Sequence, residues 1–160
     1  MITPGSVLWN YLSPQQKKLA SDGAWLFDDR KNHPTQELSD YSYLVFPFAK
    51  LYEGFLKQLF RDLHIIEERD YQSDHFRLGK VLSPNLVRRL GKRSAYQQVS
   101  DRFGEKLAQQ LWIAWKQGRN LVFHYFPHNF RALTIDEAVE RISLTVDAME
   151  AAVRVLRPSK

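Results

Sequence analysis

The residues of this chain whose types and spacing could do chemistry lie in the run 118–124. Arg119 is followed directly by Asn120 and, five positions after the arginine, by His124. An arginine is a permanent cation that can bind two phosphate oxygens at once. A histidine can accept or donate a proton near neutral pH. A phosphate-binding cation beside a proton carrier is the minimum that cleavage of RNA without a metal ion requires.

A second run has the same pattern, with Arg69 followed by Asp70 and, six positions after the arginine, by His75. It lies in a polar segment, whereas Arg119 lies in an apolar run between two helical segments. Catalytic groups need positions that packing holds in place. The surroundings therefore favour Arg119 over Arg69.

The spacing also has a geometric consequence. If the run 118–124 is helical, Asn120 and His124 lie four residues apart and share one face. Asn120 would then orient the histidine or a bound phosphate. A helix-capping Arg–Asn pair beside a partly buried histidine that bonds to a carbonyl is the other interpretation of the same residues.

Length and composition indicate one folded domain over residues 1–160. The chain has 44% apolar and 13% aromatic residues, enough for a substantial core. Its formal charge of +5 favours polyanionic partners. It contains no cysteine, which excludes a thiol nucleophile and suits a reducing cytosol.

The start of the chain and its hydropathy bear on its location. Residues 1–5 lack the charged-then-apolar pattern of a signal peptide. We find no uninterrupted apolar stretch long enough to span a bilayer. We therefore expect a cytoplasmic protein without a membrane partner.

Helical periodicity dominates, so we expect an all-α bundle of four principal helices with extra short ones. Residues 1–37 form an N-terminal helical extension in this prediction, and residues 38–157 form the bundle core. The segments predicted as helical are 5–31 (one or two helices, with a start at Ser13-Pro14), 39–64, 83–90, 94–117 and 134–156 (opened by a capping box from Thr134 to Glu137). Residues 65–82 are polar and turn-rich, and we expect a loop there with at most one short turn.

Two residues interrupt the apolar stripe of the segment 39–64. Pro47 predicts a kink or the true start of the helix. Gly54 predicts a close crossing with another helix, at a cost of about 1 kcal/mol in helix propensity.

The densest basic patch spans the end of the short helix predicted at 83–90 and the residues directly after it. Its members are Arg88, Arg89, Lys92 and Arg93. They are either a solvated helix end, where cations suit the helix dipole, or a contact for an RNA backbone.

The motif Arg119-Asn120-x3-His124, placed before a capped terminal helix in an all-α domain, resembles the HEPN superfamily of ribonucleases. The signature of that superfamily is an arginine, a polar residue and then a histidine. More narrowly, the chain is similar to the C-terminal toxin domain of RNase LS-type toxin–antitoxin systems over residues 40 to 156, with the helix around residues 51–57 adding to the likeness. A HEPN branch that is modified by nucleotidyltransferases has a tyrosine two residues after the histidine, where this chain has Phe126.

The resemblance implies an endoribonuclease that works without a metal or cofactor inside a helical homodimer, with two Arg–His motifs facing each other across the interface. The 2′-OH would attack the adjacent phosphate, leaving a 2′,3′-cyclic phosphate and a 5′-OH. Carried over to this chain, His124 acts as general base or acid, Arg119 stabilises the phosphorane charge, and Asn120 is the polar residue of the motif. An acidic residue of the earlier long helix also contributes in the toxins, and Glu53 matches it. A surface carboxylate or an ion pair with Lys50 or Lys57 is the other interpretation of Glu53.

Three functions remain open at this point. The first is a HEPN ribonuclease, acting as a toxin or defence effector held in check by an antitoxin or other regulatory protein. The second is a HEPN-fold module that binds RNA or nucleotide without catalysis, and the third is an unrelated helical adaptor. The intact Arg–Asn–His set favours the first. A metal site is poorly supported, because Pro127 separates His124 from His128, the only histidines at ligand spacing.

Overall fold

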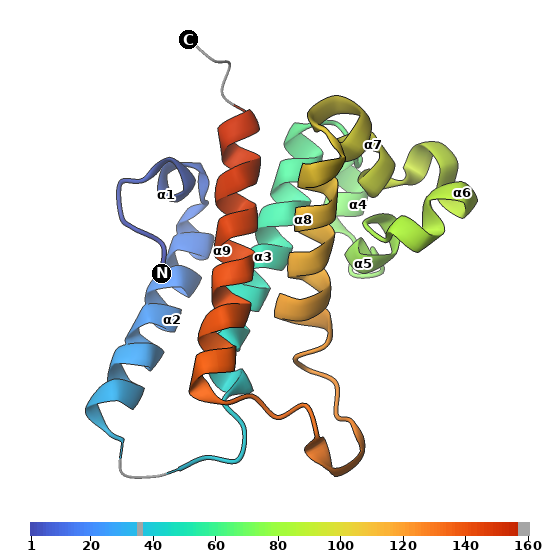
Figure 1. The fold of residues 1–160 in the computed structure, drawn as a ribbon. Coiled ribbons are helices and arrows are strands. Elements are labelled where there is room, and N and C mark those ends of the chain that lie inside the picture. Colours follow the sequence, from blue (N-terminus) through green and yellow to red (C-terminus); the bar gives the residue numbers. More distant parts are fainter. Residues whose placement is uncertain (35–36, 157–160) are drawn as a thin grey trace.

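The computed structural model describes residues 1–34 and 37–156, whose regular structure is entirely helical (Figure 1). The longer helices are α2 (Pro14–Asn32), α3 (Ser42–Asp62), α7 (Ala95–Phe103), α8 (Glu105–Trp115) and α9 (Ile135–Val155). The shorter elements are α1 (Val7–Tyr11), α4 (Glu68–Gln72), α5 (Leu78–Val81), η1 (Pro84–Leu86), α6 (Val87–Leu90), η2 (Gly91–Arg93), η3 (Lys116–Asn120) and η4 (Pro127–Asn129). The prediction of an all-α protein is confirmed for these residues. The predicted end of the bundle core, residue 157, lies outside them.

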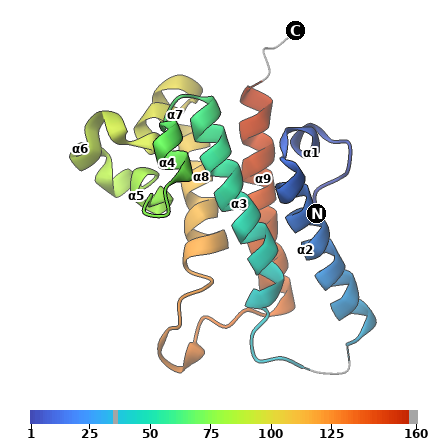
Figure 2. The same ribbon diagram turned by 180° about the vertical axis from the view of Figure 1, so that it is seen from behind.

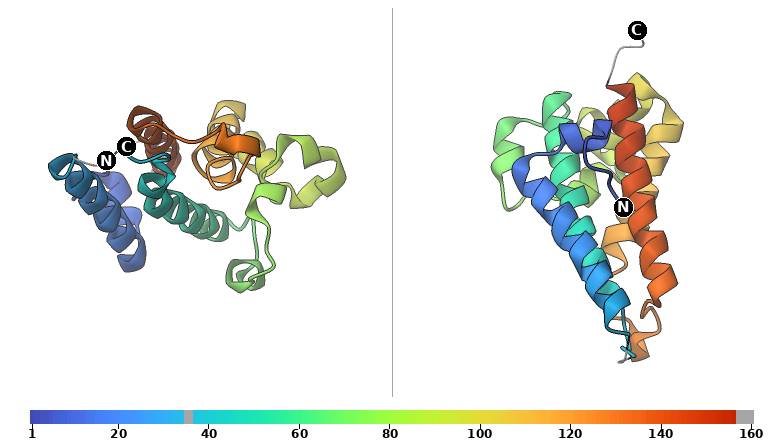
Figure 3. Two further views of the ribbon diagram at one scale, coloured as in Figure 1. Left: turned by 90° about the horizontal axis from the view of Figure 1, so that it is seen from below. Right: turned by 90° about the vertical axis from the view of Figure 1, so that its left-hand side faces the viewer.

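Helix α3 is the centre of the bundle, because α2 and α9 both pack along it (Figure 2). Its apolar stripe supplies most of the largest fully buried side chains, among them Phe48, Tyr52, Phe55 and Phe60. Helix α8 packs against α9 and joins the same core. The short elements from α4 to η2 lie on the side of the bundle away from α2, with α6 farthest out (Figure 3).

The predicted helix starts are confirmed where side-chain caps mark them. The Ser13 hydroxyl accepts a hydrogen bond from the Gln16 amide, and the Gln16 side chain accepts one from the Ser13 amide. Thr134 and Glu137 form the same reciprocal box at the start of α9. Each box satisfies amide donors that the first helical turn leaves without partners.

Two local predictions are wrong in detail, and one alternative of a third is excluded. Residues 65–82 contain two short helices, α4 and α5, in place of the expected loop. The segment 94–117 is divided into α7 and α8 by Gly104, whose φ of 93° favours glycine and ends a helix. Pro47 lies inside α3, so of the two alternatives predicted for it, a kink or the true start of the helix, the second is excluded.

The glycine at the close helix crossing is Gly23, and the expectation for Gly54 is wrong. A Cβ atom on Gly23 would lie 2.4 Å from the Phe48 ring, so α2 approaches α3 as closely as a glycine permits. A Cβ on Gly54 would lie 3.4 Å from the Gln16 side-chain nitrogen, which is ordinary contact. The crossing therefore depends on a glycine of the partner helix.

The connection from η3 to α9 lies at the end of the bundle where α3 begins (Figure 1). Asp40, just before α3, holds it there. Its carboxylate accepts hydrogen bonds from the Leu133 amide at 3.2 Å and the Asn129 side chain at 3.3 Å. It also accepts bonds from the Ser42 amide at 2.9 Å and hydroxyl at 2.6 Å.

These four bonds decide the charge state of Asp40. Partial burial raises the pKa of its carboxyl, but the hydrogen bonds from Ser42, Leu133 and Asn129 outweigh that effect, so the pKa lies below its ordinary value. Asp40 therefore ties the loop to α3 as a carboxylate. Within residues 1–34 and 37–156, no helix has both the length and the apolar content to cross a membrane.

Candidate functional site

Arg119 and Glu53, which are 66 residues apart in the sequence, meet between η3 and α3. The Nε and Nη2 atoms of Arg119 both donate to the Oε2 atom of Glu53, at 3.1 and 2.9 Å. About a third of each side chain is exposed, 36% for the arginine and 32% for the glutamate. The structure thus brings together two of the predicted site residues, and the ion pair remains in contact with solvent.

Trp115 supports the same guanidinium on one face. The Arg119 Cζ atom lies 5.0 Å from the centre of the indole ring, within the range of a cation–π contact. Glu53 holds one edge and Trp115 one face, and no residue of the described chain accepts a hydrogen bond from Nη1. Since a guanidinium has five N–H donors, Arg119 keeps donors for an anionic ligand.

Two glycines let the surrounding elements approach closely enough to form this arrangement. A Cβ on Gly118 would lie 2.5 Å from the Thr145 Cγ2 atom and 3.0 Å from the Arg141 carbonyl oxygen, so η3 presses directly on α9. A Cβ on Gly79 would lie 2.5 Å from the Trp115 Nε1 atom. Larger residues at either position would displace the backbone beside Arg119 or the ring beneath it.

The ion pair lies between two open cavities. The first, about 510 Å³, is lined by Glu53 and Arg119 together with Asn120, Arg77, Lys80 and other residues of α5 and α8. The second, about 390 Å³, is lined by the same pair with Phe46, Lys50 and Phe123 among others. We call these the α5 cavity and the loop cavity. A ligand in either can reach the Glu53–Arg119 pair.

The run 118–124 is not helical throughout, so the condition under which His124 and Asn120 would share a helix face is not met. The helix continues from α8 only as the π-helical turn η3, which ends at Asn120, and the following residues form turns. His124 is exposed in that connection. Its neighbour Phe123 packs edge-on against Phe46 of α3, with ring centres 5.9 Å apart, which holds this part of the loop beside the loop cavity.

The alternative partners proposed for Glu53 are not those of the structure. Its ion pair is with Arg119 and involves neither Lys50 nor Lys57. Lys57 instead lies 5.9 Å from the centre of the Phe76 ring. The carboxylate therefore belongs to the candidate site.

The competing arginine, Arg69, lies elsewhere. It pairs with Glu67 at 2.7 Å and has 79% of its side chain exposed. His75, the other half of that run, is also exposed, on the loop between α4 and α5. The Arg69 run thus has a less enclosed setting than the Arg119 run.

The four basic residues of the predicted patch are all exposed, on α6 and η2. They lie on the side of the bundle away from α2 (Figure 3). Lys92 and Arg93 line a further cavity of about 480 Å³, which we call the η2 cavity. The neighbouring Arg88 and Arg89 are outside its wall.

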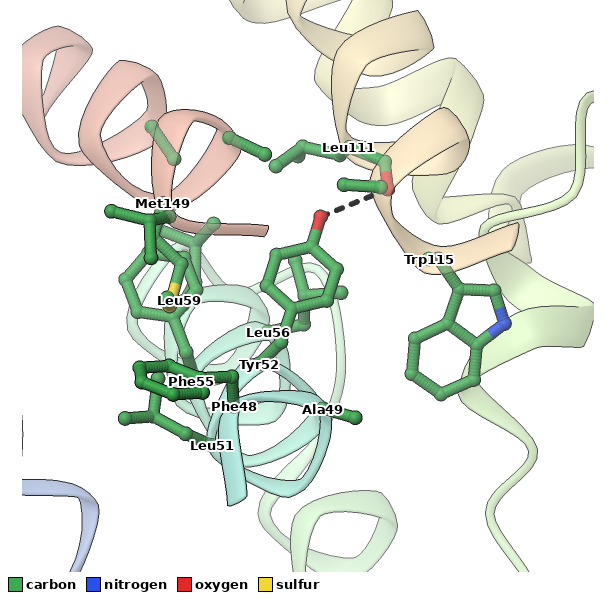
Figure 4. Close-up of a cluster of buried hydrophobic side chains, with 14 of the residues drawn as sticks. Phe48, Ala49, Leu51, Tyr52, Phe55, Leu56, Leu59, Leu111, Trp115 and Met149 are labelled. Atoms are coloured by element: carbon green, nitrogen blue, oxygen red, sulfur yellow. Dashed lines mark hydrogen bonds between the residues drawn. The ribbon is translucent and has the colours of Figure 1, made fainter. Parts of the chain in front are cut away.

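Sequence reasoning misses Trp115, Arg77 and Lys80 as parts of the site. The apolar stripe of the segment 94–117 places Trp115 in the core, and the ring is indeed buried. In Figure 4 it extends from α8 beside the core cluster around Tyr52. The sequence signal that could have placed Trp115 in the site is its spacing of four residues from Arg119, because residues four apart on a helix are neighbours.

Comparison of the chain with protein-family models, curated proteins and solved structures finds no match. In the part of the chain that the structure describes, no group of three or more histidine, aspartate or glutamate side chains is placed to hold a metal ion. By its fold and its site, the chain is an all-α protein with a solvent-accessible Arg119–Glu53 pair between two cavities.

Proposed function

We propose that this protein is a HEPN-like endoribonuclease that cleaves RNA without a metal ion. The observation that carries the proposal is the arrangement of Arg119. Its guanidinium is held by Glu53 and Trp115, it keeps hydrogen-bond donors that no described residue uses, and it lines two open cavities. A cation fixed in advance is suited to stabilise the charge that develops on a phosphate during cleavage.

The reaction assigns one task to each residue. His124 takes the proton of the 2′-OH as that oxygen attacks the adjacent phosphorus, or donates a proton to the leaving group. The P–O5′ bond breaks, the 5′ oxygen receives a proton, and a 2′,3′-cyclic phosphate remains. Arg119 stabilises the phosphorane, Glu53 orients Arg119, and Asn120 contacts the substrate from the wall of the α5 cavity.

A second copy of the chain would complete the site. The exposed rings of Phe46 and Phe123, which are 53% and 42% accessible, lie beside the loop cavity. Tyr125, next to His124, is 78% exposed. Aromatic side chains of this kind are enriched in the buried cores of interfaces. A homodimer that covers them would place the His124 of one copy near the motif of the other, and an antitoxin could restrain such an enzyme.

The test is cleavage of an end-labelled RNA in excess EDTA by the wild-type chain and by His124→Ala. We expect cleavage by the wild type alone, with cyclic-phosphate ends on the products. His128→Ala is the matched control, because His128 is another exposed histidine of the same loop and should be dispensable. Arg69→Ala is the corresponding control for Arg119→Ala.

Each outcome has one meaning. Loss of cleavage in His124→Ala and Arg119→Ala, with both controls active, would support the proposal. Equal activity of wild type and His124→Ala would refute the assignment of His124 as the residue that transfers the proton. Inactivity of the wild type, in the presence of RNA binding, would favour the non-catalytic binding module.

A further inference from the structure

The η2 cavity borders the short helix α5 through Val81, while other residues of that helix line the α5 cavity. The η2 cavity is also lined by α4 and η2, with Lys92, Arg93 and Arg69 as its cations and Glu67 and Asp70 as its acids. Arg69 is already paired with Glu67. Lys92 and Arg93 therefore supply the positive charge that is open to a ligand.

Phe76 connects this cavity with the candidate site. Its half-buried ring forms part of the wall of both the η2 cavity and the α5 cavity. The α5 cavity in turn shares Glu53 and Arg119 with the loop cavity. Three cavities thus follow one another, from the loop of His124 past Arg119 to Phe76 and on to η2.

Positive charge accompanies this series of cavities. Arg77 and Lys80 line the α5 cavity, and Lys92 and Arg93 line the η2 cavity. None of the four forms an ion pair with a carboxylate of residues 1–34 or 37–156. Arg77 donates only to the backbone carbonyl of Asp74, at 3.3 Å, which leaves its charge uncompensated.

We propose that single-stranded RNA follows this route, on the basis of the function proposed above. The strand bound at Arg119 continues through the α5 cavity, stacks an unpaired base on Phe76, and places its next phosphates beside Lys92 and Arg93. An aromatic platform between cationic pockets is how proteins hold single strands, because only an unpaired base presents its face to a side chain. Arg88 and Arg89 are outside this route.

Binding of fluorescein-labelled 12-nucleotide oligouridylate to the His124→Ala protein, followed by anisotropy, tests the route without cleavage. Each contact to a single-strand phosphate contributes about 0.7 to the slope of log K against log salt, so Lys92→Gln/Arg93→Gln should lower that slope by about 1.4. Extrapolated to 1 M salt, the parent and the double variant should bind equally. The difference in slope then makes the double variant bind about 25-fold more weakly than the parent at 0.1 M salt. Arg88→Gln/Arg89→Gln removes the same charge from the same region and should leave the slope unchanged.

The Phe76 step has its own pair of variants. Phe76→Leu keeps an apolar side chain but loses the ring face, and should weaken binding about fivefold or more. Phe76→Tyr keeps the ring and should bind as the parent does. Far-ultraviolet circular dichroism and thermal melting verify that each variant is folded.

The outcomes separate this inference from the proposed function. If the wild type cleaves RNA but the two double variants bind alike, the route is refuted while the enzyme stands. If the wild type does not cleave but binding depends on Phe76, Lys92 and Arg93, the route stands without catalysis. Equal or tighter binding of a 12-base-pair RNA duplex would refute the single-strand assignment.

Discussion

Substitution of Gly118 by alanine should destabilise the protein relative to the same change at Gly54. Both glycines lie in helical backbone, so each gains about 1 kcal/mol of helix propensity from an alanine. The new methyl at 118 meets Thr145 Cγ2 at 2.5 Å and the Arg141 carbonyl at 3.0 Å, whereas the methyl at 54 has ordinary contact with the flexible end of Gln16. Overpacking of a tight core site costs about 1–3 kcal/mol.

The propensity gain cancels in the comparison, which leaves the overpacking cost as the difference. Gly54→Ala should stabilise the fold by up to about 1 kcal/mol, and Gly118→Ala should be less stable than Gly54→Ala by about 1–3 kcal/mol. Urea denaturation followed by circular dichroism measures this. With a slope of about 2 kcal/mol per molar urea, the two midpoints should differ by about 0.5–1.5 M.

Thr145→Ser identifies the atom responsible. Serine removes the Cγ2 methyl that a Cβ at position 118 would approach to 2.5 Å, but keeps the hydroxyl that donates to the Ile142 carbonyl at 2.8 Å. The double variant should therefore lose less stability than the sum of the single changes. Equal midpoints for the two alanine variants, or strict additivity of Gly118→Ala and Thr145→Ser, would refute the close packing of η3 on α9.

Three further predictions concern the core, the loop and the ion pair. Tyr52→Phe should cost about 1 kcal/mol in urea denaturation, because its buried hydroxyl donates to the Leu111 carbonyl at 2.9 Å (Figure 4); an unchanged midpoint would contradict that bond. Asp40 has a folded-state pKa below its ordinary value of 3.8, so the stability that its carboxylate contributes is complete above pH 3.8 and is lost as the pH falls through the folded pKa. The melting temperatures of wild type and Asp40→Ala should therefore converge at acid pH, and parallel curves would refute this. Glu53→Gln should change the free energy of unfolding by less than about 1 kcal/mol, because about a third of each side chain in the ion pair with Arg119 is exposed. RNA cleavage by the same variant should fall at least tenfold, and undiminished cleavage would remove Glu53 from the site.

The sequence by itself determined the helices whose signals are local. The apolar stripe of α3, the start of α2 at Ser13-Pro14 and the capping box of α9 are properties of residues at most four positions apart, and these predictions are confirmed. Where the signal is weak, in the polar segment 65–82, the sequence does not reveal the two short helices. Helices of four or five residues are held by packing on their neighbours and carry little periodicity of their own.

For the site, the sequence singled out Arg119, Asn120 and His124, but only the tertiary structure decided their surroundings. Proximity in the sequence could not identify the ion-pair partner of Glu53, since Lys50 and Lys57 are nearer to it in sequence than Arg119. The choice depends on η3 pressing against α9 at Gly118 and on Trp115 lying over Gly79, contacts between segments far apart in the chain. Such contacts depend on how side-chain volumes fill the space between helices, and a linear pattern of residue types does not specify that.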